Sequence, residues 1–142
     1  MIELLGSKMA TKVLLDTCCF IDYFRKKPEV LPVFTRLKTN DFIGHYSILT
    51  DFELWVGVRN RKREVDTLII LRPHIRRGLS LKIARRGGEL YSQFKAAGIG
   101  PVDALLAATA ETYDLMLISN NDKHFRPLAQ AEIIKYLHYS DC

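Results

Sequence analysis

Short apolar runs alternate with helical patterns along this chain, and this alternation constrains the fold more than any other feature. Strands are predicted at residues 13–15, 42–46, 115–118 and 133–137. Helices are predicted at 18–25, 32–37, 47–58, 65–71, 79–97 and 102–113, with Gly98 ending the fifth and Pro101 opening the sixth. Strands that alternate with helices favour parallel pairing, with helices on both faces of the sheet. The pattern therefore predicts a three-layer α/β/α sandwich with a mostly parallel central sheet.

The length of 142 residues fits a single domain with its own core. We expect a loose N-terminal extension over residues 1–11 and one domain over residues 12–142, with Met9 as an alternative start. Residues 1–11 hold too short an apolar stretch for a signal peptide, and no run approaches the roughly 20 residues of a membrane span. The sequence thus predicts a soluble, cytoplasmic protein that does not use a membrane.

Basic residues outnumber acidic ones, 21 against 16, which gives a net charge of +5. The excess gathers at residues 59–63 and again at residues 72–86. A basic surface favours a polyanionic partner, because binding releases counterions. A solvated helix face is an equally good reading of charge alone, so the clusters become informative only beside a catalytic motif.

Oxygen-rich side chains stand where several predicted elements meet. Asp16 follows the first strand, residues 119–122 follow the third, and Glu53 and Asp103 lie near the starts of two helices. Ligands of parallel α/β sheets bind at the carboxyl ends of the strands. Side chains of this kind at one edge would suit a hard cation such as Mg²⁺ or Mn²⁺.

Each of these acids also has a purely structural explanation. Asp16 fits a helix N-cap, and the stretch Thr50 to Glu53 fits a capping box. Asp103 suits the first turn of a helix, and Asp122 is a common turn residue. Taken singly, each structural reading is at least as good as the functional one. The order of the acids together with their neighbouring hydroxyls is what favours a site.

In that order, the chain resembles the PIN-domain family, and in particular the VapC-type toxins of toxin–antitoxin pairs. The matching stretches are residues 14–20, 47–57, 102–110 and 115–125. Each motif is loose, but the set spans most of the chain in the order and near the spacing of the family.

The resemblance implies that Asp16, Glu53 and Asp103 are catalytic, metal-binding carboxylates. The fourth position of the family falls on Asn121 or Asp122, and we slightly favour Asp122 because a carboxylate would complete a tetrad. The resemblance also implies supporting hydroxyls, at Thr17, Ser47, Thr50 and Ser119.

The activity implied is a Mg²⁺- or Mn²⁺-dependent endoribonuclease. Its expected partners are a structured RNA such as tRNA or rRNA, a small cognate antitoxin and a second copy of the chain. Lys123 and Arg126 are the expected phosphate contacts, whereas we favour a surface-loop role for His124. Helical spacing favours Phe52 as a core residue, while Leu54 and Trp55 are alternatives for a dimer face or an antitoxin groove.

Other functions remain open at this point. A PIN nuclease of RNA processing and a non-catalytic RNA-binding module with a decayed site are the alternatives, although the intact acids argue against the second. A phosphatase of the haloacid dehalogenase type is disfavoured. Such enzymes need a second Asp two residues after the first, and Cys18 stands there.

Overall fold

The computed structural model describes residues 9–142, which form a five-stranded sheet in which every pair of neighbouring strands is parallel. The strand order is β3-β2-β1-β4-β5. The strands are β1 (Thr11–Leu15), β2 (Phe42–Ser47), β3 (Ile75–Arg77), β4 (Met116–Ser119) and β5 (Lys135–His138). Residues 1–8, most of the predicted N-terminal extension, lie outside the described residues.

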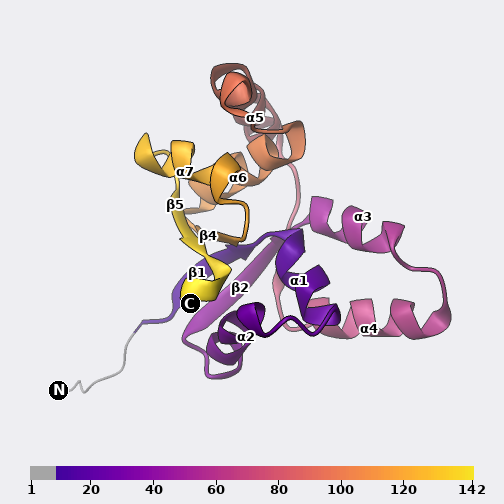
Figure 1. The fold of residues 1–142 in the computed structure, drawn as a ribbon. Coiled ribbons are helices and arrows are strands. Elements are labelled where there is room, and N and C mark those ends of the chain that lie inside the picture. The colour runs from indigo at the N-terminus through magenta and orange to yellow at the C-terminus, as the bar shows by residue number, and fades with distance from the viewer. Residues whose placement is uncertain (1–8) are drawn as a thin grey trace.

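Helices connect the strands and cover the sheet (Figure 1). They are α1 (Thr17–Phe24), α2 (Leu31–Lys38), α3 (Ile48–Val56), α4 (Arg61–Leu71), α5 (Leu81–Phe94), α6 (Pro101–Tyr113) and α7 (Asp122–Gln130). Short 3-10 turns are η1 (Pro28–Val30), η2 (Lys95–Ala97) and η3 (Tyr139–Asp141). Among residues 9–142, no helix combines the length and the apolar character that a membrane crossing needs.

Two hydrophobic cores lie on opposite faces of the sheet. Along β1, Leu14 joins the core beneath α5, α6 and α7, whereas Val13 and Leu15 join the core beneath α1 and α2. Successive strand residues point to opposite faces. Both faces of the central strands are therefore buried, and the predicted three-layer α/β sandwich is confirmed.

The contact between α5 and α6 depends on a glycine. A Cβ atom at Gly87 would lie 2.7 Å from Cδ2 of Leu105, so any larger residue would force the Leu105 side chain to move. The neighbouring Gly88 has nothing within 4 Å of its would-be Cβ. Gly87, which by sequence only weakens a helix, thus has a packing role against Leu105 of α6.

The structure adds two elements that the sequence analysis missed. Residues 122–130, for which no helix was predicted, form α7 with Pro127 inside it, because Phe125 and Leu128 bury one face of the helix. The edge strand β3 was not predicted because Ile75–Arg77 is short and mostly basic.

The prediction that Phe52 belongs to the core is wrong. Its side chain is 68% exposed, whereas Leu54 is buried. The inward side of α3 carries Thr50 and Leu54, one turn apart, which leaves Phe52, Trp55 and Val56 facing outward.

Candidate active site

The candidate site lies where the chain reverses its direction of travel across the sheet. From β1 the chain proceeds to β2 and β3 on one side, and it later returns to β4 and β5 on the other. The carboxyl ends of β1 and β4 therefore border the crevice in which such sheets bind ligands. Asp16 follows β1 and Ser119 ends β4, and the Ser119 hydroxyl donates a hydrogen bond of 2.8 Å to Asp16 Oδ2.

Asp16 combines the two roles weighed from the sequence. Its Oδ1 caps α1 by accepting from the backbone N–H of Thr17 at 2.7 Å, while Oδ2 faces Ser119. Burial raises the pKa of Asp16 to about 6; the negative charges of Asp103 and Glu53 also raise it, against the opposing hydrogen bonds from Ser119 and Thr17. The carboxylate is thus poorly solvated and lies within electrostatic reach of the other two acids.

Glu53 does not form the capping box that the sequence allowed. The N-cap of α3 is Ser47, whose hydroxyl accepts from the backbone N–H of Leu49 at 3.0 Å. Glu53 Oε1 instead accepts a 2.5 Å hydrogen bond from the Thr17 hydroxyl, which lies 2.9 Å from that of Thr50. Two of the predicted supporting hydroxyls therefore connect α1 and α3 beneath Glu53.

Asp103 lies in the first turn of α6, and His124 Nδ1 contacts its Oδ2. Asn121 Nδ2 lies 2.7 Å from the same ring nitrogen. His124 is therefore not the surface-loop residue favoured by the sequence analysis: it lies in the first turn of α7, and its side chain is only 27% exposed. The unpredicted α7 turns this histidine toward Asp103, which sequence spacing could not show.

Asp122 makes its contacts in a different direction. Its Oδ1 accepts a 2.5 Å hydrogen bond from the Tyr136 hydroxyl on β5, and its Oδ2 lies 3.2 Å from Arg126. The hydrogen bond from Tyr136, followed by that from Arg126, holds the pKa of Asp122 below its ordinary value despite partial burial. Of the two candidates for the fourth position, Asn121 is joined to Asp103 through His124, and Asp122 is joined to β5.

Asp16, Glu53 and Asp103 line one open hollow of about 460 Å³. Its other walls come from Thr17 and from four apolar side chains, namely Ile21, Phe52, Val56 and Val102. Within residues 9–142, no three Asp, Glu, His or Cys side chains are arranged to hold a metal ion in their present conformations. Each of the three carboxylates is instead engaged by a neighbouring side chain: Ser119, Thr17 or His124.

The donor set nevertheless fits a hard cation. All three acids present oxygen, and their mutual repulsion helps to raise the pKa of Asp16. A divalent cation would relieve that repulsion, and oxygen ligands are those that Mg²⁺ and Mn²⁺ prefer. Rotation of the carboxylates away from their present partners would be needed to bring them to one ion.

The basic clusters are less free than the sequence indicates. Arg61, Lys62, Arg76 and Arg86 form ion pairs with Glu64, Asp66, Asp51 and Glu111 respectively. Lys123 is exposed in the first turn of α7, and Arg126 is 56% exposed despite its contact with Asp122. Lys123 and Arg126 thus lie on the same helix as His124, which contacts Asp103.

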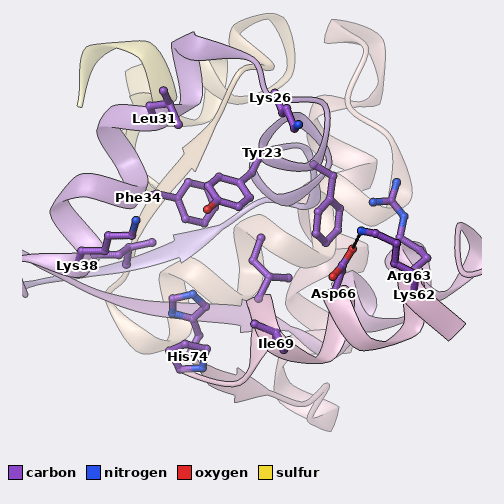
Figure 2. Close-up of a pocket in the computed structure, with 14 residues that line it drawn as sticks. Tyr23, Lys26, Leu31, Phe34, Lys38, Lys62, Arg63, Asp66, Ile69 and His74 are labelled. Carbon is purple, nitrogen blue, oxygen red and sulfur yellow. Dashed lines mark hydrogen bonds and ion pairs between the residues drawn. The ribbon is translucent and has the colours of Figure 1, made fainter.

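A second, larger hollow of about 780 Å³ lies between α1, α2 and α4 (Figure 2). The rings of Tyr23 and Phe34 form part of its lining, with their centroids 4.2 Å apart. Ile69 is 61% exposed within it, and Lys26 and Lys38 are among its basic lining residues. It is an apolar groove with a positive rim.

Comparisons with known proteins place the chain in a family. The model of the PIN domain matches residues 13–130. Ribonuclease VapC19 of Mycobacterium tuberculosis is 34% identical over 115 residues, which cover 79% of this chain and 90% of the relative. A toxin–antitoxin complex from Klebsiella pneumoniae contains a chain 29% identical to this one, with a TM-score of 0.68 and coverage of 80% of this chain and 89% of that one.

A similar fold occurs in VapBC2 from Rickettsia felis, solved bound to a DNA fragment from its promoter. The TM-score is 0.75 at 21% identity, over 90% of this chain and 98% of that one. The family match spans most of the chain and includes Asp16, Glu53 and Asp103. This chain therefore belongs to the PIN-domain family.

Proposed function

We propose that this protein is a metal-dependent endoribonuclease and the toxin of a toxin–antitoxin pair. The observation that carries the proposal is the convergence of Asp16, Glu53 and Asp103 on one hollow at the carboxyl end of the sheet. The name of the relative from Mycobacterium tuberculosis, a ribonuclease, supports RNA as the substrate.

In this proposal Asp16, Glu53 and Asp103 hold Mg²⁺ or Mn²⁺. When bound, such a cation lowers the pKa of a coordinated water and neutralises charge on the scissile phosphate. The hydroxyls of Thr17 and Ser119 orient Glu53 and Asp16 through direct hydrogen bonds, and the Thr50 hydroxyl supports that of Thr17. One of these three carboxylates would serve as the general base toward the attacking water.

For the fourth metal ligand, the proposal keeps two candidates, Asn121 and Asp122. Asp122 is hydrogen-bonded to the hydroxyl of Tyr136, whereas Asn121 lies beside His124. Lys123 and Arg126 would contact phosphates, because both are exposed cations on the helix that borders the acids.

We further propose that the apolar groove between α1, α2 and α4 binds the cognate antitoxin, and that the active toxin is a homodimer. The groove is larger than the acidic hollow, and its positive rim favours a segment of mixed apolar and acidic character. Solved structures of similar fold are toxin–antitoxin complexes. Ile69→Asp should weaken capture of the antitoxin without unfolding the toxin, because Ile69 is mostly exposed.

Cleavage of defined structured RNAs by the purified protein tests the proposal. Wild type should cut in Mg²⁺ or Mn²⁺ and stop in a chelator, and Asp16→Asn and Asp103→Asn should lose at least about 100-fold in rate, the scale of one essential electrostatic group. Asp114→Asn is the matched control, since Asp114 is a surface residue paired with Lys135 and has the left-handed backbone that Asn tolerates. Equal cutting by wild type and Asp103→Asn would refute the assigned site.

Two alternatives remain distinguishable. Cleavage with no effect on growth and no antitoxin partner would favour a nuclease of RNA processing. RNA binding with neither metal binding nor cleavage would favour a non-catalytic module.

A further inference from the structure

Two tyrosine hydroxyls from the C-terminal end of the chain contact the turn that carries Ser119. We call residues 119–122 the β4 turn. Tyr136 on β5 donates its proton to Asp122 Oδ1 at 2.5 Å, and its hydroxyl also lies 3.3 Å from the carbonyl oxygen of Ser119. One phenol thus touches both ends of the β4 turn.

The second hydroxyl belongs to Tyr139 in η3, and it is anchored to a buried acid. Tyr139 donates to Asp22 Oδ2 at 2.7 Å, and both side chains are almost fully buried. Asn120 Nδ2 lies 3.5 Å from the Tyr139 hydroxyl and 3.4 Å from Asp22 Oδ2. A buried carboxylate depends on its donors, because leaving it unpaired is costly. In the middle of the β4 turn, Asn120 therefore contacts the buried Tyr139–Asp22 pair, which joins η3 to α1.

The β4 turn in turn sets the position of a candidate metal-binding acid. The Ser119 hydroxyl donates to Asp16 Oδ2 and accepts from the backbone N–H of Asn121 at 3.1 Å. The orientation of this hydroxyl therefore depends on the backbone of the same turn that Tyr136 and Tyr139 contact. A displaced turn would move the donor that orients Asp16.

We propose that Tyr136 and Tyr139 are positioning residues that fix the β4 turn and, through Ser119, the orientation of Asp16. The inference rests on the proposed function, since it concerns the efficiency of that site. Neither tyrosine lines the acidic hollow, so both act through other residues. The C-terminal segment is thus part of the active-site support as well as of the sheet edge.

The test uses Tyr136→Phe and Tyr139→Phe in the full chain, each of which removes one oxygen and keeps the ring. Tyr91→Phe is the matched control, because Tyr91 is exposed on α5, away from the turn. Calorimetric titration with MnCl₂ measures metal affinity, and hydrogen exchange measures protection of the amide of Asn121. Loss of supporting hydrogen bonds around metal ligands weakens affinity about 10- to 100-fold. We expect that loss, with faster exchange, in both variants and neither change in the control.

Several results would overturn the proposal. Unchanged Mn²⁺ affinity and unchanged exchange in both variants would show that the hydroxyls position nothing. Tighter Mn²⁺ binding by Tyr136→Phe would show that Tyr136 holds Asp122 away from the metal, which is the opposite role. If Tyr139→Phe fails to fold because Asp22 loses one of its donors, the double variant Tyr139→Phe/Asp22→Asn removes the buried charge and still breaks the contact between Tyr139 and the turn.

The two proposals fail in different ways. If wild type binds no Mn²⁺, the metal site of the proposed function is wrong, and the exchange measurement alone decides the role of the tyrosines. If wild type binds Mn²⁺ and loses it on Asp16→Asn while both tyrosine variants match wild type, only the inference about the tyrosines is wrong.

Discussion

Replacing Asp16 by Asn should stabilise the metal-free protein at neutral pH while abolishing its activity. Burial raises the pKa of Asp16 from its ordinary 3.8 to about 6, which corresponds to about 3 kcal/mol of unfavourable free energy when the group is ionised. Asn removes the charge but also weakens the hydrogen bond with Ser119, at about 1 kcal/mol. The net gain in the free energy of unfolding is then about 2 kcal/mol.

The pH dependence of this gain follows from the sign of the shift. Because the folded protein binds the Asp16 proton more tightly than the unfolded chain, the cost of ionisation is fully present above about pH 6 and absent below pH 3.8. Urea unfolding of wild type and Asp16→Asn in a chelator, at pH 8 and at pH 4, measures it. The variant should be the more stable at pH 8, and the gap should shrink at pH 4. If Asp16→Asn were less stable than wild type at pH 8, the claim that the buried, ionised Asp16 destabilises the folded protein would be refuted.

Three further predictions concern named contacts. Gly88→Ala should stabilise by about 0.5–1 kcal/mol, and Gly87→Ala should be less stable than Gly88→Ala by about 1–3 kcal/mol, because overpacking against Leu105 opposes the same helix gain; thermal unfolding of the pair checks this. Thr17→Val should weaken Mn²⁺ binding about 10-fold by removing the donor to Glu53, and Thr17→Ser should restore it, as seen by calorimetry. Burial lowers the pKa of His45 below its ordinary value of 6.5. Because His45 takes up a proton more readily in the unfolded chain than in the folded protein, the free energy of unfolding should fall as the pH drops below 6.5. Urea unfolding across that range should show a shallower fall for His45→Gln than for wild type.

The sequence predicted the central strands and most helices because these elements have strong local signals. The apolar runs at β1, β2 and β4 are short and bounded, and Pro28, Pro73 and Pro101 mark helix boundaries. It missed β3, whose few residues are mostly basic and pair only at the sheet edge. It also missed α7, because the polar residues after β4 and Pro127 favour a turn locally, while the burial of Phe125 and Leu128 decides for a helix.

The three acids could be named from their order along the chain, but their connections could not. The bond from Thr17 to Glu53 joins residues 36 apart, and that from Ser119 to Asp16 joins residues 103 apart. No periodic pattern reports such pairings. His124 was undervalued for the same reason, since its role depends on α7 turning it toward Asp103. Phe52 was misplaced because helical spacing identifies an apolar face without showing which side of α3 meets the core.

The central claim is that Asp16, Glu53 and Asp103 together bind a divalent cation. Calorimetric titration of Mn²⁺ at pH 6 and pH 8, in buffers of different ionisation enthalpy, tests it most directly. Because the pKa of Asp16 is about 6, metal binding at pH 6 should release part of a proton, and binding at pH 8 should release almost none. Asp16→Asn should remove the proton release, and Glu53→Gln and Asp103→Asn should each weaken binding at least about 10-fold, while Asp114→Asn should match wild type. Binding that none of the three site variants alters would contradict the account.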